Sequence, residues 1–255
     1  MSCESFSPNQ SSQRPRVESS ARPVVAIIPA AGSGARLGSA LPKALVAVGG
    51  TPIVRRTVDT LVAVGRFLRI VVAVPPAHRR QFEHALDGVA GLALVAGGAE
   101  RQASVRAGID YVERELPEVI DHGSILVHDA ARCLLSHDLI NRCLAKHAHA
   151  RAVTAAMPVV DTLVRADTLG VVQDAIDRAA VYAIQTPQIF EGRLLRDAHA
   201  RGIVGATDDA SLVAPLEAVH LVTGDRFNIK ITTPDDLVLG EVLAKIGMSS
   251  EGMTR

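Results

Sequence analysis

Short apolar runs recur along the chain, and segments with a helical spacing of apolar residues separate them. The runs are rich in Val, Ile, Leu and Ala and do not alternate with polar residues, as expected of parallel strands covered on both faces. We predict strands at residues 24–29, 69–74, 92–96, 124–127 and 152–157, and helices near residues 53–62, 77–86, 101–116 and 137–149. This alternation predicts an α/β fold with a Rossmann-like, doubly wound and mostly parallel sheet.

The alternation of strands and helices stops after Pro158. Strand-like residues at 162–164 and 171–172 flank the turn-forming stretch 166–170, which predicts a β-hairpin over residues 159–176. An isolated two-stranded hairpin is only marginally stable in water. We therefore expect this hairpin to project as an arm and to pack on another surface, with a second copy of the chain as its partner.

The strand and helix pattern resumes after the hairpin. We predict strands at residues 182–186, 219–223 and 228–231, and helices from Gly192, near residues 208–215 and after Thr233. Thr233 can cap the last helix, with Pro234 at its first position and acidic residues in its first turn. The pattern predicts one domain at residues 24–247, which includes the arm, between tails at residues 1–23 and 248–255 that we expect to be disordered.

Composition narrows the choice of partners and compartment. Lys plus Arg and Asp plus Glu both number 27 in the 255 residues, so no overall field attracts nucleic acid or an anionic membrane. The three cysteines have no C-x-x-C spacing, and the nine histidines form no ligand cluster in the sequence. No apolar run has the length of a membrane span, and the first residues contain no apolar signal region. We therefore expect a cytoplasmic protein without nucleic-acid or membrane partners.

A glycine-rich loop, PAAGSGARLGSALPK, follows the first predicted strand at residues 29–43. Gly32, Gly34 and Gly38 allow backbone angles that other residues disfavour and let peptide N–H groups approach a phosphate. The third glycine comes one residue too late for the dinucleotide motif G-x-G-x-x-G, and the P-loop motif is absent. The loop is therefore a phosphate-binding candidate of a different type.

Two cations lie on this loop. Arg36 and Lys43 are seven residues apart, and Pro42 stiffens the approach to Lys43. A flexible surface turn with two solvated charges is the alternative interpretation. The buried type of strand before the loop and the small residues Ala30 and Ala31 favour a binding loop.

The carboxyl ends of other predicted strands also end in polar or glycine residues, and ligands of open α/β sheets bind at these ends. After residues 92–96, Gly98 leaves room for a flat base near the backbone and Ser104 can hydrogen-bond to it. An ordinary turn with a helix cap is the alternative here. Asp129 follows residues 124–127 and can bind Mg²⁺ or a ribose hydroxyl, or else cap a helix or pair with Arg132.

Further polar residues occur at later element ends. Lys230 stands in an otherwise apolar predicted strand, so its ammonium group must reach solvent or an anion. Thr186, Thr207 and Asp208 lie at neighbouring ends.

Taken in order, eight motifs resemble those of the 2-C-methyl-D-erythritol 4-phosphate cytidylyltransferase family, which acts in non-mevalonate isoprenoid synthesis and has a nucleotidyltransferase fold. They are PAAGSGARLG with Pro42-Lys43, GGAERQAS, VHDAAR, Asp161-Thr162, Asp177-Arg178, QTPQ, TDDAS and NIKITTPDDL, and the resemblance covers about residues 24–246. The resemblance implies transfer of CMP from CTP to the phosphate of 2-C-methyl-D-erythritol 4-phosphate, with release of pyrophosphate and with Mg²⁺ as the cofactor. It also implies a homodimer that exchanges the hairpin arm.

The resemblance also implies a role for single residues. Arg36 and Lys43 would stabilise the transition state, while Asp129 would face the ribose or the metal. Arg178 and Lys230 would hold the substrate phosphate and count among the catalytic residues. The nucleotide site would further contain Ala30, Ala31, Gly32, Gly34, Gly98 and Ser104, and the substrate site would further contain Arg132, Thr162, Thr186 and Thr207.

Two departures from the family pattern and two alternatives remain. Ala99 stands where relatives can have Asp, and Cys133 stands where relatives often have Pro. No second catalytic domain follows Ile246, so we expect the form with a single activity. The alternatives are a cytidylyltransferase for ribitol 5-phosphate and a catalytically inactive nucleotide-binding protein of the same fold.

Overall fold

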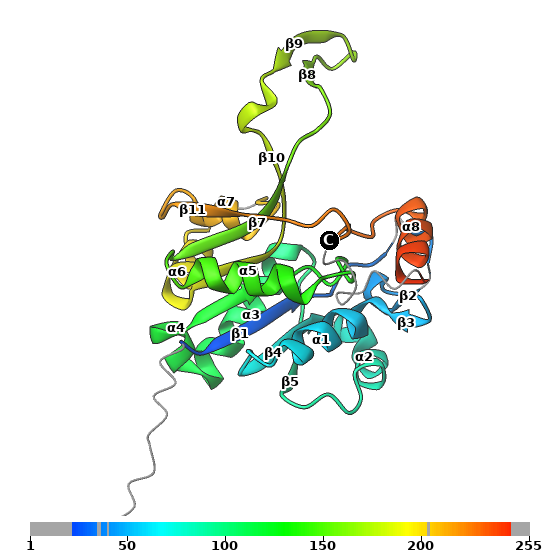
Figure 1. Cartoon of the computed structure of the whole chain (residues 1–255). Helices are drawn as coiled ribbons and strands as arrows, with labels where there is room; N and C mark the ends of the chain where they lie inside the picture. Colours follow the sequence, from blue (N-terminus) through cyan, green and yellow to red (C-terminus); the bar gives the residue numbers. More distant parts are fainter. Residues whose placement is uncertain (1–21, 35–36, 40, 203–204, 246–255) are drawn as a thin grey trace, which may run out of the picture.

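The computed structural model describes residues 22–34, 37–39, 41–202 and 205–245. A seven-stranded sheet with the strand order β11-β7-β10-β6-β1-β4-β5 forms its centre (Figure 1). Its strands span Val24–Pro29 (β1), Arg69–Val74 (β4), Leu92–Ala96 (β5), Ser124–Val127 (β6), Ala152–Pro158 (β7), Tyr182–Glu191 (β10) and Val219–Thr223 (β11). The strands predicted before the hairpin are all present, with β7 one residue longer than predicted.

Most strands of this sheet run in one direction. β1 pairs in parallel with β4 and β6, β4 with β5, and β7 with β11. Among the described strands of the sheet, β10 alone runs antiparallel, to both β6 and β7. The carboxyl ends of β1, β4, β5 and β6 therefore meet at one edge, where ligands of such sheets bind. The predicted mostly parallel sheet is confirmed.

Helices cover both faces of the sheet (Figure 1). Ala26 and Ile28 of β1 share a buried cluster with residues of α1, α2 and α5, whereas Val25 and Ile27 share one with residues of α3, α4, α6 and α7. This two-sided burial explains the continuous apolar runs and confirms the doubly wound fold. The helices span Ile53–Val64 (α1), Arg79–Ala85 (α2), Arg101–Glu115 (α3), Pro117–His122 (α4), His137–His147 (α5), Gly192–Ala200 (α6), Asp209–Val213 (α7) and Pro234–Lys245 (α8).

Residues 228–231 do not form the predicted strand. They run extended beside the segment that follows β6, where the Ile231 N–H donates to the Ala131 carbonyl oxygen at 2.8 Å and the Arg132 guanidinium donates to the Asn228 carbonyl oxygen at 2.8 Å. One backbone–backbone hydrogen bond and one bond from a side chain do not make the regular backbone pairing of a β-sheet. Ile231 is nevertheless fully buried, in an apolar cluster with residues of α8, with Val48 of the two-residue strand Ala47–Val48 (β2) and with Ile53, the first residue of α1; β2 pairs with Thr51–Pro52 (β3).

The predicted hairpin is present and projects far from the sheet (Figure 1). Leu163–Ala166 (β8) and Val172–Ile176 (β9) pair antiparallel in a separate two-stranded sheet. The ends of β7 and β10 form the stem, with Tyr182 opposite Pro158. β10 continues to Glu191, five residues beyond the predicted end at 186.

The last helix begins as predicted. The Asp236 N–H donates to the Thr233 hydroxyl at 3.3 Å, and the Asp236 carboxylate accepts the N–H groups of Thr232 and Thr233 at 2.8 Å each. Of the predicted tails, the structure describes only Arg22 and Pro23, and the remaining residues lie outside the described part of the chain. Across the described residues, the helices lack the combination of length and apolar character that crossing a membrane requires.

Candidate active site

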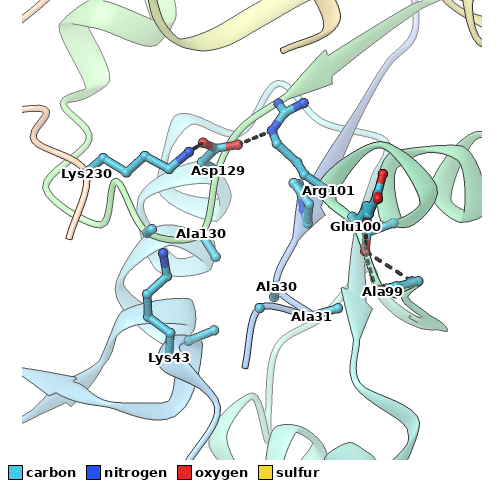
Figure 2. Close-up of a pocket in the computed structure, with 15 residues that line it drawn as sticks. Ala30, Ala31, Lys43, Ala99, Glu100, Arg101, Asp129, Ala130 and Lys230 are labelled. Carbon is cyan, nitrogen blue, oxygen red and sulfur yellow. Dashed lines mark hydrogen bonds and ion pairs between the residues drawn. The ribbon is translucent and has the colours of Figure 1, made fainter. Parts of the chain in front are cut away.

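A pocket opens at the carboxyl ends of β1, β5 and β6, where the glycine-rich loop and the start of α3 meet (Figure 2). Small residues leave the space: Ala30 and Ala31 follow β1 directly, and the Ala30 N–H donates to the Ala73 carbonyl oxygen at 2.8 Å. The pocket is lined by Pro29, Ala30, Ala31, Gly32, Lys43, Ala44, Gly98, Ala99, Glu100, Arg101, Ser104, Asp129, Ala130, Ala131 and Lys230. The structure thus brings together most of the residues predicted for the nucleotide site.

Two predicted residues of the glycine-rich loop stand apart. Gly34 does not line the pocket; its φ is +78°, and a Cβ there would come within 2.9 Å of the Lys43 backbone nitrogen. Gly34 therefore lets the loop fold back close to Lys43. The Lys43 N–H donates to the Gly32 carbonyl oxygen at 3.3 Å, and the Lys43 side chain lines the pocket (Figure 2). Arg36 lies outside the described residues.

Ser104 organises the loop between β5 and α3. Its hydroxyl oxygen accepts the Gly98 N–H at 3.1 Å and donates to the Glu100 carbonyl oxygen at 3.1 Å. A Cβ at Gly98 would meet the Cβ of Ala103 at 2.4 Å, so only glycine fits there without movement. Ser104 therefore lines the pocket and also holds the turn at Gly98, although the helix α3 has no side-chain cap at its first turn.

We expect Ser104→Ala to weaken CTP binding about five- to tenfold, because the loss of one buried hydrogen-bonding partner costs about 1 kcal/mol and loosens the loop at Gly98. Titration of the protein with CTP would measure this change. Thr60→Val is the matched control, since the Thr60 hydroxyl also donates to a helix carbonyl four residues earlier, at 3.0 Å, but lies on α1. Equal CTP affinity in the two variants would contradict the expectation.

Asp129 lies between two cations at the centre of the site (Figure 2). Its Oδ1 accepts Arg101 Nε at 2.7 Å and its Oδ2 accepts Lys230 Nζ at 2.6 Å. Burial alone would raise the pKa of Asp129, but Arg101 and Lys230 outweigh it and hold the pKa well below its usual range. Asp129 is therefore a fixed negative charge. The alternative side-chain pairing with Arg132 is wrong, since the Arg132 guanidinium donates to backbone carbonyls.

Arg101 is a site residue that the sequence did not single out. It is the first residue of α3, and it bridges Asp129 and Asp209, with its NH1 donating to Asp209 Oδ2 at 2.8 Å. Although burial would lower the pKa of Arg101, Asp209 and Asp129 raise it further above its usual value. The motif that contains Arg101 was visible in the sequence, but its two partners lie 28 and 108 residues away.

A second pocket adjoins the first and shares Arg101, Asp129 and Lys230 with it. Its lining is polar and comes from the middle of β10 and from the residues before α7. The residues are Arg101, Asp129, Arg132, Ile184, Gln185, Thr186, Gln188, Thr207, Asp208 and Lys230. The predicted substrate-site residues Arg132, Thr186, Thr207 and Lys230 therefore lie together.

His128 supports this wall without chemistry of its own. Burial lowers the pKa of His128 to about 4, so its ring is neutral near pH 7. Its Nε2 lies 3.1 Å from the Arg132 carbonyl oxygen and must be the donor, which leaves Nδ1 to accept from the Thr186 hydroxyl at 3.0 Å. Thr186 in turn accepts the Asp129 N–H at 3.0 Å. His128 therefore has a local role, in which its ring links the Arg132 carbonyl oxygen to the Thr186 hydroxyl.

Comparison with known proteins identifies the family. The family of 2-C-methyl-D-erythritol 4-phosphate cytidylyltransferases (IspD) matches residues 24–245. This chain belongs to that family. The predicted enzyme class and the predicted reaction, CMP transfer from CTP to 2-C-methyl-D-erythritol 4-phosphate, are those of the family.

Relatives support the assignment along nearly their whole length. The 2-C-methyl-D-erythritol 4-phosphate cytidylyltransferase of Nocardia farcinica is 50% identical over 222 residues, which are 86% of this chain and 93% of the relative. The crystal structure of the Thermus thermophilus cytidylyltransferase is 35% identical with a TM-score of 0.70, and the match covers 88% of this chain and 99% of that chain. The corresponding synthase structure from Anaerococcus prevotii is 27% identical with a TM-score of 0.75, over 88% and 99% of the two chains.

Two residues that the family resemblance places at the substrate do not reach the site within this chain. Thr162 lies on the arm and Arg178 just beyond its end. Both are exposed and line neither pocket, and the Arg178 guanidinium donates to the Val160 carbonyl oxygen. Within the described residues, no group of three or more His, Cys, Asp or Glu side chains could hold a metal ion. Asp129 is the carboxylate that both pockets share.

Proposed function

We propose that CTP binds in the first pocket and the acceptor phosphate in the second, and that the shared wall of Arg101, Asp129 and Lys230 joins the two reactants. The observation that carries this assignment is that these residues line both pockets. The first pocket offers small residues and backbone at Ala30 and Gly98, which suit a nucleotide. The second offers hydroxyl and cationic groups, which suit the phosphate of a sugar alcohol.

The reaction is a displacement at phosphorus. An oxygen of the acceptor phosphate attacks the α-phosphorus of CTP, the new P–O bond forms, and the bond to the bridging oxygen breaks with pyrophosphate as the leaving group. A phosphate monoester is ionised near pH 7 and is itself the nucleophile, so no side chain needs to accept a proton. Positioning and charge neutralisation remain as the tasks of the enzyme.

Cations at the two pockets fit these tasks. Lys43 lines the nucleotide pocket, Lys230 lines both pockets, and Arg132 lines the second. Both reactants are anions, so these groups offset repulsion that would otherwise keep the two phosphates apart. The ion pair with Asp129 holds the Lys230 ammonium group between the two pockets, where the attacking oxygen of the acceptor must meet CTP.

We further propose that Mg²⁺ is the cofactor, with Asp129 as its protein ligand. Mg²⁺ in proteins is usually held by one or two carboxylates together with substrate phosphates, and the wall that the two pockets share supplies one such carboxylate, Asp129. Asp129 accepts one cationic donor on each oxygen, and a carboxylate has further lone pairs. The bound ion would neutralise phosphate charge, while Arg101 and Lys230 keep Asp129 oriented and ionised.

The acceptor is 2-C-methyl-D-erythritol 4-phosphate, and the test is pyrophosphate release with this alcohol phosphate, with ribitol 5-phosphate, and with each of the four nucleoside triphosphates. We expect turnover with CTP and 2-C-methyl-D-erythritol 4-phosphate, and its loss when a chelator removes divalent cations. Equal or better turnover of ribitol 5-phosphate would overturn the substrate assignment. No turnover with any pair would favour the inactive binding protein.

Two finer assignments belong to the same proposal. The chain acts as a homodimer through the arm, because the exposed apolar residues Val164, Val171 and Val172 have no cover within the described chain. It works in the cytoplasm, which agrees with the unpaired state of the buried Cys133 and Cys143. Burial raises the pKa of these thiols to about 11 and about 12, respectively, which keeps them protonated.

A further inference from the structure

Asp209 and His199 form a buried pair behind the wall between the two pockets, and neither residue lines a pocket. His199 lies on α6 and Asp209 is the first residue of α7, and each side chain is 1% exposed. His199 Nε2 is 2.8 Å from Asp209 Oδ1. Burial would raise the pKa of Asp209, but Arg101 and His199 hold it below its usual range, so the carboxylate is ionised and the imidazole N–H donates.

The backbone at Asp209 is also held in place. The side-chain oxygen of Gln188, a fully buried residue of β10, accepts the N–H groups of Asp209 at 3.1 Å and Ala210 at 3.0 Å. Because β10 is part of the central sheet, this contact ties the start of α7 to the rigid core. Asp209 therefore has a fixed backbone and a side chain held from one side by His199.

The second carboxylate oxygen of Asp209 contacts Arg101, which lines both pockets. Asp209 Oδ2 accepts Arg101 NH1 at 2.8 Å, Arg101 Nε donates to Asp129 Oδ1 at 2.7 Å, and Asp129 Oδ2 accepts Lys230 Nζ at 2.6 Å. Hydrogen-bond donors and acceptors alternate along this series from His199 to Lys230. The third guanidinium nitrogen of Arg101, Nη2, is buried and has no hydrogen-bond partner among the described residues. Two carboxylates therefore fix the orientation of Arg101.

We propose that Asp209 and His199 are positioning residues of the transfer reaction, which act through Arg101 on Asp129 and Lys230. This inference rests on the proposed assignment of the two pockets. Without the Asp209 carboxylate, Arg101 keeps a single anionic partner and can rotate. The positions of the Asp129 carboxylate and the Lys230 ammonium group are then no longer fixed through Arg101. A misplacement of about 1 Å at reacting groups can lower a rate about 100-fold. The competing explanation is that the pair only stabilises the fold.

A double-mutant cycle between Asp209 and Arg101 separates these explanations, with kcat/KM for the acceptor measured at saturating CTP. We expect Asp209→Asn to lower kcat/KM about 10- to 100-fold. We expect the same substitution to change it less than about threefold in an Arg101→Lys background, because the residue through which Asp209 acts is then already displaced. Effects that multiply would overturn the proposal, since a purely structural loss does not depend on Arg101.

Variants of His199 provide a second measurement if Asp209→Asn folds poorly. His199→Leu removes the donor to Asp209 and should lower kcat/KM about three- to tenfold, whereas His199→Gln places an amide N–H near the same point and should stay within about twofold of wild type. His147→Leu is the matched control, since His147 is equally buried and its Nε2 lies 2.7 Å from the Ser124 hydroxyl, but it lines neither pocket.

The stability of each variant is measured alongside its kinetics. We expect His147→Leu to lower the melting temperature and to keep kcat/KM within about twofold of wild type. If His199→Leu also lowers only the melting temperature, the positioning role is wrong. If the wild-type chain itself releases no pyrophosphate, the proposed function fails instead, so the two failures are distinguishable.

Discussion

Replacing Lys43 with alanine is expected to lower the turnover rate by about 10²- to 10⁴-fold. The side chain lines the nucleotide pocket, and charge that develops on the phosphates in the transition state needs a cation already in place. The backbone on either side of Lys43 holds it there: Pro42 and Ala44 are buried, and the Lys43 N–H donates to Gly32. The expected loss of stability is small because these neighbours stay in place.

Single-turnover measurements with saturating CTP would report this effect, with thermal unfolding as the measure of stability. Lys146→Ala is the matched control, because Lys146 is an exposed lysine on α5 that lines neither pocket. Arg36→Ala should act like Lys43→Ala if the resemblance of the loop to the family holds. Wild-type turnover in the Lys43 variant would show that the loop cation is merely solvated.

The sheet was predictable because its apolar runs are buried on both faces. In β1, alternate residues face opposite helical layers, so every position must be apolar and the strand is visible from composition alone. β10 was harder, since Pro187 interrupts its pattern and the strand continues past it to Glu191. The six-residue α4 was missed because it follows α3 after only one intervening residue, and such short helices have little periodicity of their own.

The prediction of a strand at residues 228–231 was wrong for a physical reason. Isoleucines on both sides of Lys230 are typical of a strand, and Asn228 and Ile231 are buried, yet the backbone of the segment pairs with Ala131 and Arg132 through isolated hydrogen bonds. Its burial comes from side-chain packing against α8. A local pattern records that a residue is buried, but the identity of its backbone partner depends on the tertiary fold.

The site residues that could be predicted from the sequence are those that come directly after the end of a strand. Ala30, Gly98 and Asp129 come just after β1, β5 and β6, so a parallel sheet brings them together. Arg101 and Asp209 were missed because their importance lies in a pairing across 108 residues. No periodicity encodes such a contact. Gly34 was assigned to the ligand because glycine suits both ligand approach and tight turns, and the structure assigns it to the turn.

Deleting residues 165–173 is expected to convert the protein into monomers that still bind CTP but bind the acceptor poorly. The arm exposes large apolar side chains, with Val160 67%, Leu169 86% and Val172 59% exposed, and these need a partner surface. The ion pair between Arg165 and Asp174 within the hairpin is itself exposed. The nucleotide pocket contains no residue of the arm, so its affinity should persist.

Sedimentation would measure the first effect, and titration with the acceptor in the presence of CTP would measure the second. Arg178→Ala in the full-length chain is the matched control, because it removes one predicted phosphate contact but leaves the apolar arm residues intact. We expect this variant to remain a dimer and to bind the acceptor weakly. A wild-type chain that sediments as a monomer while it turns over normally would contradict the dimer.

Mixing two inactive variants decides whether the arm completes the site of its own chain or of its partner. Lys43 lines the nucleotide pocket, whereas Arg178 directly follows the projecting arm and lines neither pocket of the same chain. If arms are exchanged, a dimer of one Lys43→Ala chain and one Arg178→Ala chain contains one site with both cations intact. Random mixing should then restore about one quarter of wild-type activity, because about half of the dimers are mixed and each carries one intact site. If every site uses its own arm, each site lacks one cation and mixing restores nothing.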